Sequence, residues 1–334
     1  MIIVISGTFN FLLSAEGACM SANDDSNLPE VEKIPLVIDA EFTEEEEIRS
    51  QTSSLHEISS QKTSRPLDLP YPTPTPDGRA RVITVINQKG GVGKTTTVIN
   101  IASQLALRGH RILVVDADSQ GNCATGLGVD KSKVQHTTRD LILSPETAIS
   151  ARHATAVDGL HMIVGDRSLV GLEQEMLRQL GRERRLSEAL EPLLPHYDIV
   201  IIDTPPTISS LTQEALAASD YYLIPAKPEF LAVEGVSQAM SFAKITISSI
   251  KKADPIFLGV VLNQVDTRRA SFKDFETELK FLLSDKMFNS KISQLTEIAD
   301  SPFYSKTVLD FKEQSRARLE FLEFSNEFIE RVSL

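Results

Sequence analysis

Short apolar runs alternate with longer amphipathic segments from residue 81 to the C-terminus. The apolar runs are rich in Val and Ile and predict buried strands at residues 82–86, 111–116, 160–164, 198–203, 221–225 and 256–263. The segments between and after them predict helices at residues 97–107, 169–180, 182–194, 209–218, 233–251 and 314–332. Such alternation predicts an α/β fold, with a mostly parallel, twisted sheet, helices on both faces and ligands at the carboxyl ends of the strands.

The last predicted helix is expected to pack against the sheet through the apolar side chains Leu319, Leu322, Phe324 and Phe328. Its polar positions include the four acidic residues Glu320, Glu323, Glu327 and Glu330. An acidic helix is a poor match for an anionic bilayer, and no apolar run in the chain approaches the roughly 20 residues that span one. We therefore expect no stable membrane association.

The first 80 residues differ in composition from the rest. They hold fourteen Asp and Glu against five Lys and Arg, so most of the chain's net charge of −12 lies there. An acidic run at 44–47 and a Pro-rich stretch at 66–76 predict a disordered tail and an extended linker at residues 1–80, preceding one domain at residues 81–334. Apolar islands at 34–38 and 48–58 either dock on a partner or belong to a plain solvated tail.

The N-terminus and the cysteines bear on the compartment. Residues 1–13 are apolar but lack the positively charged start of a signal peptide, and Met20 is an alternative start. Cys19 and Cys123 are too few for a disulfide framework, which fits a reducing cytoplasm. We interpret Cys123, which falls close to the candidate ligand site, as a small packed residue.

Residues 88–96 read Gln-Lys-Gly-Gly-Val-Gly-Lys-Thr-Thr and join the first predicted strand to the first predicted helix. Glycines let backbone N–H groups approach a ligand, and the start of a helix favours an anion. Lys94 is expected to reach the β- and γ-phosphates of a nucleotide, and the Thr95 hydroxyl to hold Mg²⁺. The expected nucleotide-binding residues are Gly90, Gly91, Val92, Gly93, Lys94, Thr95 and Thr96.

Carboxylates at two other strand ends complete the candidate site. Asp203 ends an apolar strand of the Walker B kind and is expected to bind Mg²⁺ directly or through water. Asp116 and Asp118 end a neighbouring predicted strand. The alternative for Asp118 is a role in capping its own loop.

The phosphate loop departs from the common G-x-x-x-x-G-K-[ST] pattern, because Gln88 replaces the first glycine and Lys89 adds a second lysine. This K-G-G-x-G-K-T-T form resembles the deviant Walker A motif of the ParA/MinD ATPases. Further similarity lies in Thr204-Pro205-Pro206 after Asp203, in the D-x-D segment at Asp116, and in two later stretches at 221–225 and 230–236. The resemblance runs from about residue 81 to the C-terminus.

The resemblance implies a P-loop NTPase fold, ATP and Mg²⁺ as cofactors, and slow hydrolysis stimulated by a partner. It implies an ATP-bound homodimer in which Lys89 reaches the phosphates of the other subunit, although Lys89 in a monomer is simply a solvated side chain. Asp118 would orient the attacking water and, with Thr95 and Asp203, lie at the metal. Ser119 stands where the family has Pro, which puts the timing of the switch in doubt.

Residues at and after the end of the last predicted strand are candidates for contacts with the nucleotide base and with DNA. Asn263 falls where the family contacts adenine, but Asn263-Gln264-Val265-Asp266 also looks like a guanine-reading N-K-x-D motif. Arg268 and Arg269 fall where a DNA-binding arginine is expected, with solvated surface charges as the alternative. A later basic run of the family is replaced here by a segment containing Gln294 and Glu297, although Lys286, Lys291 and Lys306 are nearby.

These observations favour a cytoplasmic, nucleoid-associated ParA-type ATPase that partitions a plasmid, a chromosome or another large cargo. It would act with a ParB-like DNA-binding or adaptor partner and with non-specific DNA. Two alternatives stay open: a MinD-like regulator that cycles on a membrane, and an ATPase that positions a protein cargo such as a chemoreceptor cluster or a carboxysome.

Overall fold

The structure is a computed structural model that describes residues 78–332, except 177–181, 230–231 and 251–254. The expected tail at residues 1–80 therefore lies outside the described residues, apart from its last three. The two apolar islands, both candidate start codons and Cys19 lie outside them as well.

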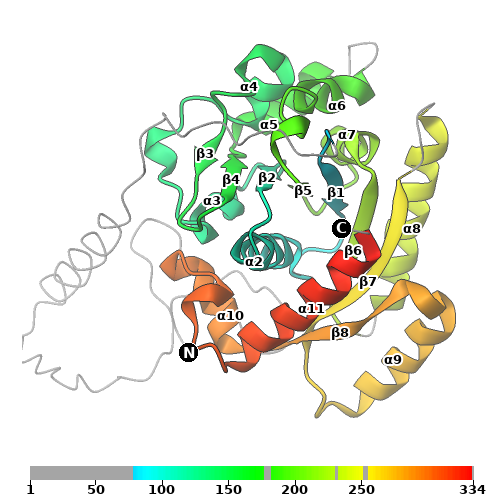
Figure 1. Cartoon of the computed structure of the whole chain (residues 1–334). Coiled ribbons are helices and arrows are strands. Elements are labelled where there is room, and N and C mark those ends of the chain that lie inside the picture. Colours follow the sequence, from blue (N-terminus) through cyan, green and yellow to red (C-terminus); the bar gives the residue numbers. More distant parts are fainter. Residues whose placement is uncertain (1–77, 177–181, 230–231, 251–254, 333–334) are drawn as a thin grey trace, which may run out of the picture. The chain divides into compact units, whose positions relative to one another are not determined.

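The centre of the domain is an eight-stranded sheet with the order β3-β4-β2-β5-β1-β6-β7-β8 (Figure 1). Its strands are β1 (Arg81–Val85), β2 (Ile112–Asp116), β3 (His153–Ala154), β4 (Leu160–Ile163), β5 (Ile199–Asp203), β6 (Tyr221–Ala226), β7 (Ile256–Val265) and β8 (Met287–Ser293). Every pair is parallel except β3 with β4, which confirms the predicted mostly parallel sheet.

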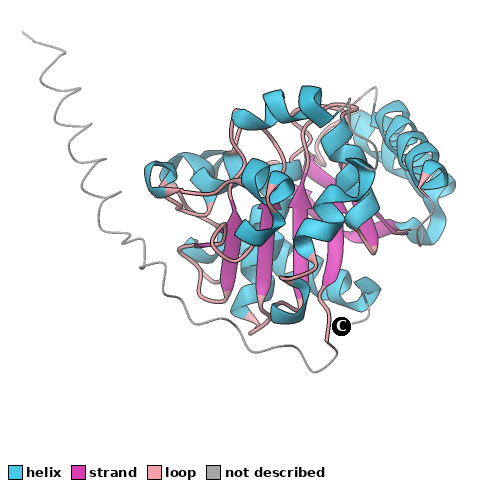
Figure 2. Ribbon diagram, turned by 90° about the horizontal axis from the view of Figure 1, so that it is seen from above, coloured by secondary structure: helices cyan, strands magenta, loops and turns pink. Residues whose placement is uncertain are grey.

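Helices lie on both sides of the strands, as Figure 2 shows. They are α2 (Lys94–Leu107), α3 (Asn122–Gly126), α4 (Thr138–Leu143), α5 (Ser168–Met176), α6 (Arg185–Leu190), α7 (Ser210–Ala218), α8 (Ala232–Ser249), α9 (Ala270–Leu283), α10 (Thr296–Asp300) and α11 (Arg316–Val332). Short 3₁₀ turns lie at Lys131–Lys133, Pro145–Thr147, Arg182–Arg184, Leu194–His196, Ser284–Lys286, Ser301–Tyr304 and Val308–Asp310.

Alternate side chains of each strand enter different cores. In β1, Ile83 packs with apolar residues of α2, α3 and α11 on one face of the sheet. Its neighbour Val82 points to the opposite face, where α4, α5, α6 and α7 form a second core. A third core on that second face joins α8 and α9 to β6 and β7. The central strands are thus buried on both faces, which explains why their sequences read as continuous apolar runs.

One predicted helix differs from the structure, and several observed elements were not expected. The helix expected at 182–194 divides into a 3₁₀ turn, α6 and a second 3₁₀ turn, because Pro195 lacks the N–H that a continuing helix needs. Strands β3 and β8 and helices α3, α4, α9 and α10 were not expected. The sequence of β8 includes exposed and half-buried polar positions, so it lacks the continuous apolar run that marks the inner strands.

The predicted packing of the last helix is only half right. Phe324 and Phe328 are buried in α11, but Leu319 is 44% exposed and Leu322 is 38% exposed, so the prediction for these two leucines is wrong. The helix presents Phe321 to the core in their place. Across the residues that the structure describes, no helix is both long enough and apolar enough to cross a bilayer.

Strand register sets the position of the candidate site. Asp203 of β5 lies beside Val85 of β1 on one side and beside Asp116 of β2 on the other. Because the three strands are parallel, the loops that follow them leave the same edge of the sheet. β5 lies between β1 and β2, although it follows both in the chain, so residues about 90 to 120 positions apart meet at this edge.

Candidate nucleotide-binding site

The loop between β1 and α2 has the backbone of a phosphate cradle. Gly91 has φ +73° and Gly93, which precedes the first residue of α2, has φ +90°. A Cβ atom on Gly93 would stand 2.0 Å from Nδ2 of Asn263, so this position accepts only glycine. Val92 is buried and fixes the loop to the body of the domain, whereas Gly90 and Gly91 are exposed and present their backbone to a ligand.

Two residues at the end of β7 hold the loop between β1 and α2 through hydrogen bonds. Asn263 Nδ2 donates to the Gly93 carbonyl and to Thr97 Oγ1, both at 3.3 Å, and its Oδ1 accepts from the Gln264 N–H. Gln264 adopts a left-handed conformation, with φ +54°, and its Nε2 donates to the Gly91 carbonyl at 2.7 Å. Two consecutive side chains thus hold two carbonyl groups of the loop.

This brace bears on two expectations from the sequence. Asn263 is only 2% exposed and its amide is already bonded within the protein, so the adenine contact stays a prediction. Sequence reasoning missed the role of Gln264. The only signal was a pair of polar residues inside an otherwise apolar strand, which also suited the base-reading interpretation.

Lys94 begins α2, three residues earlier than predicted, and is 7% exposed. Burial lowers the pKa of its ammonium group, and the charges of Asp203 and Asp118 oppose that shift. A buried ammonium group attracts a bound polyphosphate more strongly than an exposed one, because water screens the interaction little.

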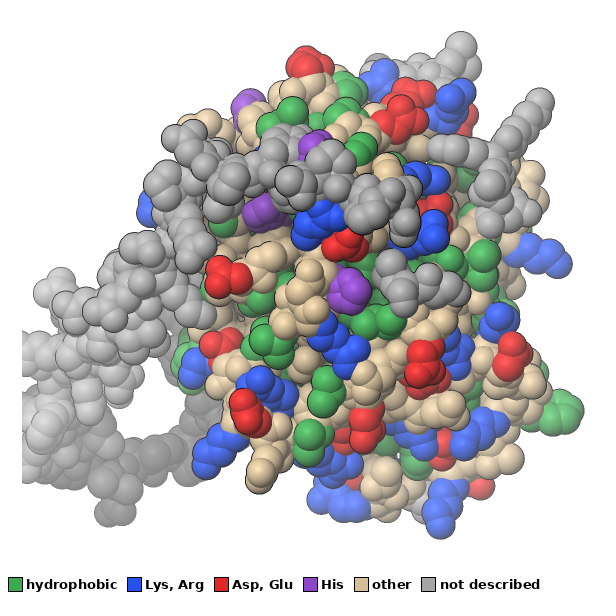
Figure 3. Space-filling view, in the orientation of Figure 1, with side chains coloured by type: hydrophobic (Ala, Val, Ile, Leu, Met, Phe, Trp, Pro, Cys, Tyr) green, Lys and Arg blue, Asp and Glu red, His purple; other side chains and the backbone are tan. Residues whose placement is uncertain are grey.

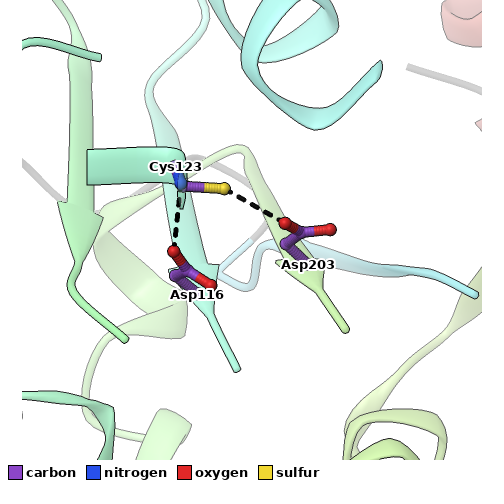
Figure 4. A group of neighbouring side chains, drawn as sticks. All are labelled: Asp116, Cys123 and Asp203. Carbon is purple, nitrogen blue, oxygen red and sulfur yellow. Dashed lines mark hydrogen bonds between the residues drawn. The ribbon is translucent and has the colours of Figure 1, made fainter. Parts of the chain in front are cut away.

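Thr95, Asp116, Cys123 and Asp203 converge at the start of α2. Thr95 Oγ1 donates to Asp203 Oδ2 at 2.6 Å, and the Cys123 thiol donates to the same oxygen at 3.3 Å (Figure 4). Asp116 accepts from the backbone N–H groups of Asp118 at 3.0 Å and Cys123 at 3.2 Å. Asp203 Oδ1 is buried and lacks a hydrogen-bond partner among the described residues.

The carboxylates of this group carry an electrostatic cost that a cation would relieve. Burial raises the pKa of Asp203 to about 6, against the hydrogen bonds from Thr95 and Cys123. Burial raises the pKa of Asp116 well above its usual range, and the charge of Asp203 adds to this shift. Burial likewise raises the pKa of the Cys123 thiol well above normal, with Asp116 and Asp203 contributing. Each negative group disfavours ionisation of the others.

Asp118 lies 7% exposed at the same edge. Its Oδ1 accepts the N–H of Gln120 at 3.0 Å, so the residue does cap its own loop, as the alternative from the sequence had it. It also borders a cavity of about 280 Å³ that the turn at Pro205 and Pro206 lines from the other side. The loops after β2 and β5 thus enclose a space beside the expected metal ligands.

Lys89 does not point freely into solvent. Its Nζ lies 2.8 Å from Glu229 Oε2, and Lys227 Nζ lies 2.5 Å from the other oxygen of the same carboxylate. These two bonds, first that of Lys227 and then that of Lys89, lower the pKa of Glu229 to about 2. Lys89 is about a third exposed, so exchange of this partner for another anion requires no unfolding.

The two expected DNA-binding arginines lie on the loop after β7. Arg268 is 89% exposed at its side chain and Arg269 is 56% exposed, and both form salt bridges with Asp266. They stand apart from the hydrogen bonds that join Thr95, Asp116, Cys123 and Asp203, and their contact with DNA stays a prediction.

The residues at this edge fit a nucleotide with a divalent metal. The fit depends on a cradle with room for no Cβ at Gly93, on the buried ammonium of Lys94, and on the unpartnered Oδ1 of Asp203 beside the Thr95 hydroxyl. Oxygen atoms of carboxylates and hydroxyls are the ligands that Mg²⁺ prefers. The arrangement suits polyphosphate binding at a helix N-terminus.

Comparison with known proteins identifies relatives that cover about three quarters of the chain. A family model described as an AAA domain matches residues 80–256. The sporulation initiation inhibitor protein Soj of Bacillus subtilis is 35% identical over 247 residues, which cover 74% of this chain and 97% of Soj. The chromosome partitioning protein ParA of Caulobacter vibrioides is 34% identical over 253 residues, covering 75% of this chain and 94% of that protein.

Solved structures share the fold. Cobyrinic acid a,c-diamide synthase from Mycobacterium smegmatis, with bound ATP analog and magnesium, superposes with a TM-score of 0.66 at 28% identity, covering 76% of this chain and 96% of that one. A putative plasmid partition protein from Borrelia burgdorferi, bound to AMPPNP, gives a TM-score of 0.64 at 21% identity, covering 76% and 100%. The second likeness shows the fold alone.

Proposed function

The chain belongs to the ParA/MinD family of partition ATPases, and we propose that it couples ATP binding and hydrolysis to the partition of a chromosome or plasmid. The choice of DNA as cargo is supported by relatives named for chromosome partitioning, which match this chain over more than nine tenths of their own length. The main structural support for ATPase activity is the 2.6 Å hydrogen bond between Thr95 of α2 and Asp203 of β5, which lies beside the buried Lys94.

ATP and Mg²⁺ are the proposed cofactors. The loop N–H groups between β1 and α2 bind the phosphates, and Lys94 neutralises charge on the β- and γ-phosphates. Thr95 and Asp203 hold the metal, with Asp118 nearby. When bound, Mg²⁺ supplies positive charge that stabilises the phosphate oxygens during transfer. A solved relative at 28% identity that contains an ATP analog and magnesium supports this assignment.

Hydrolysis needs a group that orients water, and Asp118 is our candidate. The residue borders the cavity between the loops after β2 and β5, and within the described part of the chain only one of its carboxylate oxygens is engaged, by the Gln120 N–H. Both loops leave the sheet at the same edge as the phosphate loop, so the presence or loss of the γ-phosphate would bias their conformation.

Three kinds of association are proposed for the ATP-bound chain: with a second copy of itself, with DNA and with a partner protein. We propose that the ATP-bound chain is a homodimer, in which Lys89 leaves Glu229 and binds the phosphates held by the other subunit. Non-specific DNA of the nucleoid serves as the track, and a ParB-like partner stimulates slow hydrolysis. The salt bridge of Lys89 lies next to the phosphate loop and is only partly buried, which supports such an exchange of partners.

The catalytic assignment is tested with two variants. Lys94→Ala should abolish binding of ATP·Mg²⁺ in calorimetry, because the triphosphate loses its buried cation. Asp118→Ala should retain binding and lose turnover, measured as phosphate release. The matched control is Asp130→Ala, which removes an exposed carboxylate just before the 3₁₀ turn Lys131–Lys133. This variant should bind ATP·Mg²⁺ and release phosphate as the native chain does. Normal turnover by Asp118→Ala would exclude that residue from the mechanism.

The dimer is tested through the two lysines that share Glu229. Lys89→Ala should bind ATP but remain a monomer on a sizing column with ATP, because no ammonium group then reaches the phosphates of the other subunit. Lys227→Ala removes a lysine from the same carboxylate and leaves Lys89 in place, so it should dimerise as the native chain does. ATP-dependent dimerisation of Lys89→Ala would rule out the trans role.

A further inference from the structure

A thiol stands between the two buried carboxylates of the site. Asp116, Cys123 and Asp203 are each 0% exposed, and one potential ligand atom from each lies within 4.8 Å of the others. Figure 4 shows the thiol of Cys123 pointing toward Asp203, while the backbone nitrogen of Cys123 faces Asp116. The ATPase chemistry proposed above gives this thiol no role.

The cluster also contains an unsatisfied acceptor. Asp203 Oδ2 accepts hydrogen bonds from Thr95 and Cys123, but Oδ1 is buried without a hydrogen-bond partner among the described residues. A buried carboxylate oxygen without a partner is costly and rare in folded proteins. A cation bound by Asp203 would offset the burial of the two acidic groups.

The donor set determines the chemical class of that cation. Mg²⁺ and Ca²⁺ take oxygen ligands, whereas thiolate ligands select softer metals such as Zn²⁺ and Cd²⁺. A tetrahedral zinc ion with bonds of about 2.3 Å to sulfur and 2.0 Å to oxygen places those two atoms about 3.5 Å apart. The observed distance from Cys123 Sγ to Asp203 Oδ2 is 3.3 Å, so these two ligands need little movement.

We propose that Asp116, Cys123 and Asp203 form a binding site for a thiophilic divalent cation of the zinc and cadmium class. Binding replaces the S–H bond of Cys123 with a metal–sulfur bond and releases one proton to solvent. Water or an added anion completes the coordination.

The cation regulates the nucleotide site. Asp203 is the proposed ligand of Mg²⁺ and also a ligand of the thiophilic ion, so the two metals compete for it. Zinc therefore inhibits binding of ATP·Mg²⁺, and a zinc-selective chelator restores it. This regulatory consequence rests on the proposed ATPase function, whereas the cation site itself requires no nucleotide.

The test uses the full chain with Cys19→Ser, so that Cys123 is the remaining thiol. Metal-free protein is titrated with Cd²⁺ alone, and the ultraviolet absorption of the thiolate–cadmium bond is recorded. We expect this absorption to saturate at one cadmium per chain. Adding Cys123→Ser should abolish it, and Asp116→Asn should keep it but weaken cadmium binding at least about tenfold. Cys123→Ala serves in place of the serine variant if that variant does not fold.

The outcomes separate this proposal from the ATPase proposal. Absence of the absorption in a protein that binds ATP·Mg²⁺ overturns the cation site and leaves the ATPase intact. Absorption that persists without Cys123, or that ignores Asp116→Asn, also overturns the site. A cadmium signal of the expected stoichiometry in a protein that binds no nucleotide supports the site and refutes the ATPase.

Discussion

The conformation of Gly93 depends on a residue 170 positions later in the chain. Asn263 occupies the space that a side chain at Gly93 would need, and it donates to the carbonyl of that same glycine. The φ of +90° alone already disfavours any other residue. Steric exclusion and backbone conformation therefore impose the same requirement at this position.

We predict that Gly93→Ala disrupts nucleotide binding. The left-handed conformation costs an L-residue about 1–2 kcal/mol, and the new methyl group also displaces Asn263. Combining it with Asn263→Ala removes the clash but not the backbone cost, so affinity should recover only in part. Calorimetry with ATP·Mg²⁺ and urea unfolding measure both effects.

Gly90→Ala is the control for that prediction. Gly90 belongs to the same loop, has nothing within 4 Å of an added Cβ and has no positive φ. The free energy of unfolding of the Gly90→Ala variant should differ from that of the native chain by less than about 1 kcal/mol, as for other unstrained substitutions. A loss of stability in the Gly93 variant no larger than that in the Gly90 variant would contradict the steric argument.

At the scale of elements, α11 connects the late part of the chain to the first helix and the last strand. Its buried face packs with residues of α2 in one core, and two of its glutamates reach β8. Glu327 accepts from the backbone N–H groups of Asn289 and Ser290, and Glu320 accepts from that of Ser293. The acidic character of the helix thus has a structural use within the domain.

The face of α11 that packs against the core leads to a prediction about stability. Phe324→Ala should lower the free energy of unfolding by about 3–5 kcal/mol, because the ring is fully buried among Phe288, Phe321 and Phe328. Leu322→Ala, on the more exposed side of the same helix, should cost less than about 1.5 kcal/mol. Urea denaturation measures both, and equal losses would mean that the helix packs with a different face.

Sequence reasoning worked where a segment's own pattern decided its structure. Strands β1, β2 and β5 are buried on both faces, so their apolar runs were recognisable, and Asp116 and Asp203 at their ends followed. Strand β8 lacked such a run. The left-handed turn at Gln264 and its bond to Gly91 arise from contacts between distant segments, which no local pattern encodes.

At the scale of the whole domain, charge is nearly balanced, because residues 81–334 hold 29 Lys and Arg against 32 Asp and Glu. On the face seen in Figure 3, basic and acidic side chains are intermixed. Two of the lysines expected to assist DNA binding are paired, Lys291 with Glu276 and Lys286 with Asp285. We therefore expect DNA binding to require the proposed ATP-dependent dimer, which doubles the number of cations presented.

We predict that the native chain with ATP binds random duplex DNA in a steeply salt-dependent way. Replacing both Arg268 and Arg269 by Ala should reduce the slope of log affinity against log salt by about 1.8 per subunit, because each phosphate that an arginine neutralises contributes about 0.9 to it. Arg316→Ala removes another exposed, salt-bridged arginine and should leave the slope unchanged. An unchanged slope in the double variant would place the DNA interface elsewhere.

The brace from β7 onto the glycine loop has a consequence for synthesis on the ribosome. The loop is translated early, but Asn263 and Gln264, which hold its carbonyl groups, follow about 170 residues later. In a nascent chain that has emerged only as far as β6, these two contacts have not yet formed, and the apolar side of α2 still awaits α11. We therefore expect the phosphate loop to reach its final conformation only after β7 has been synthesised.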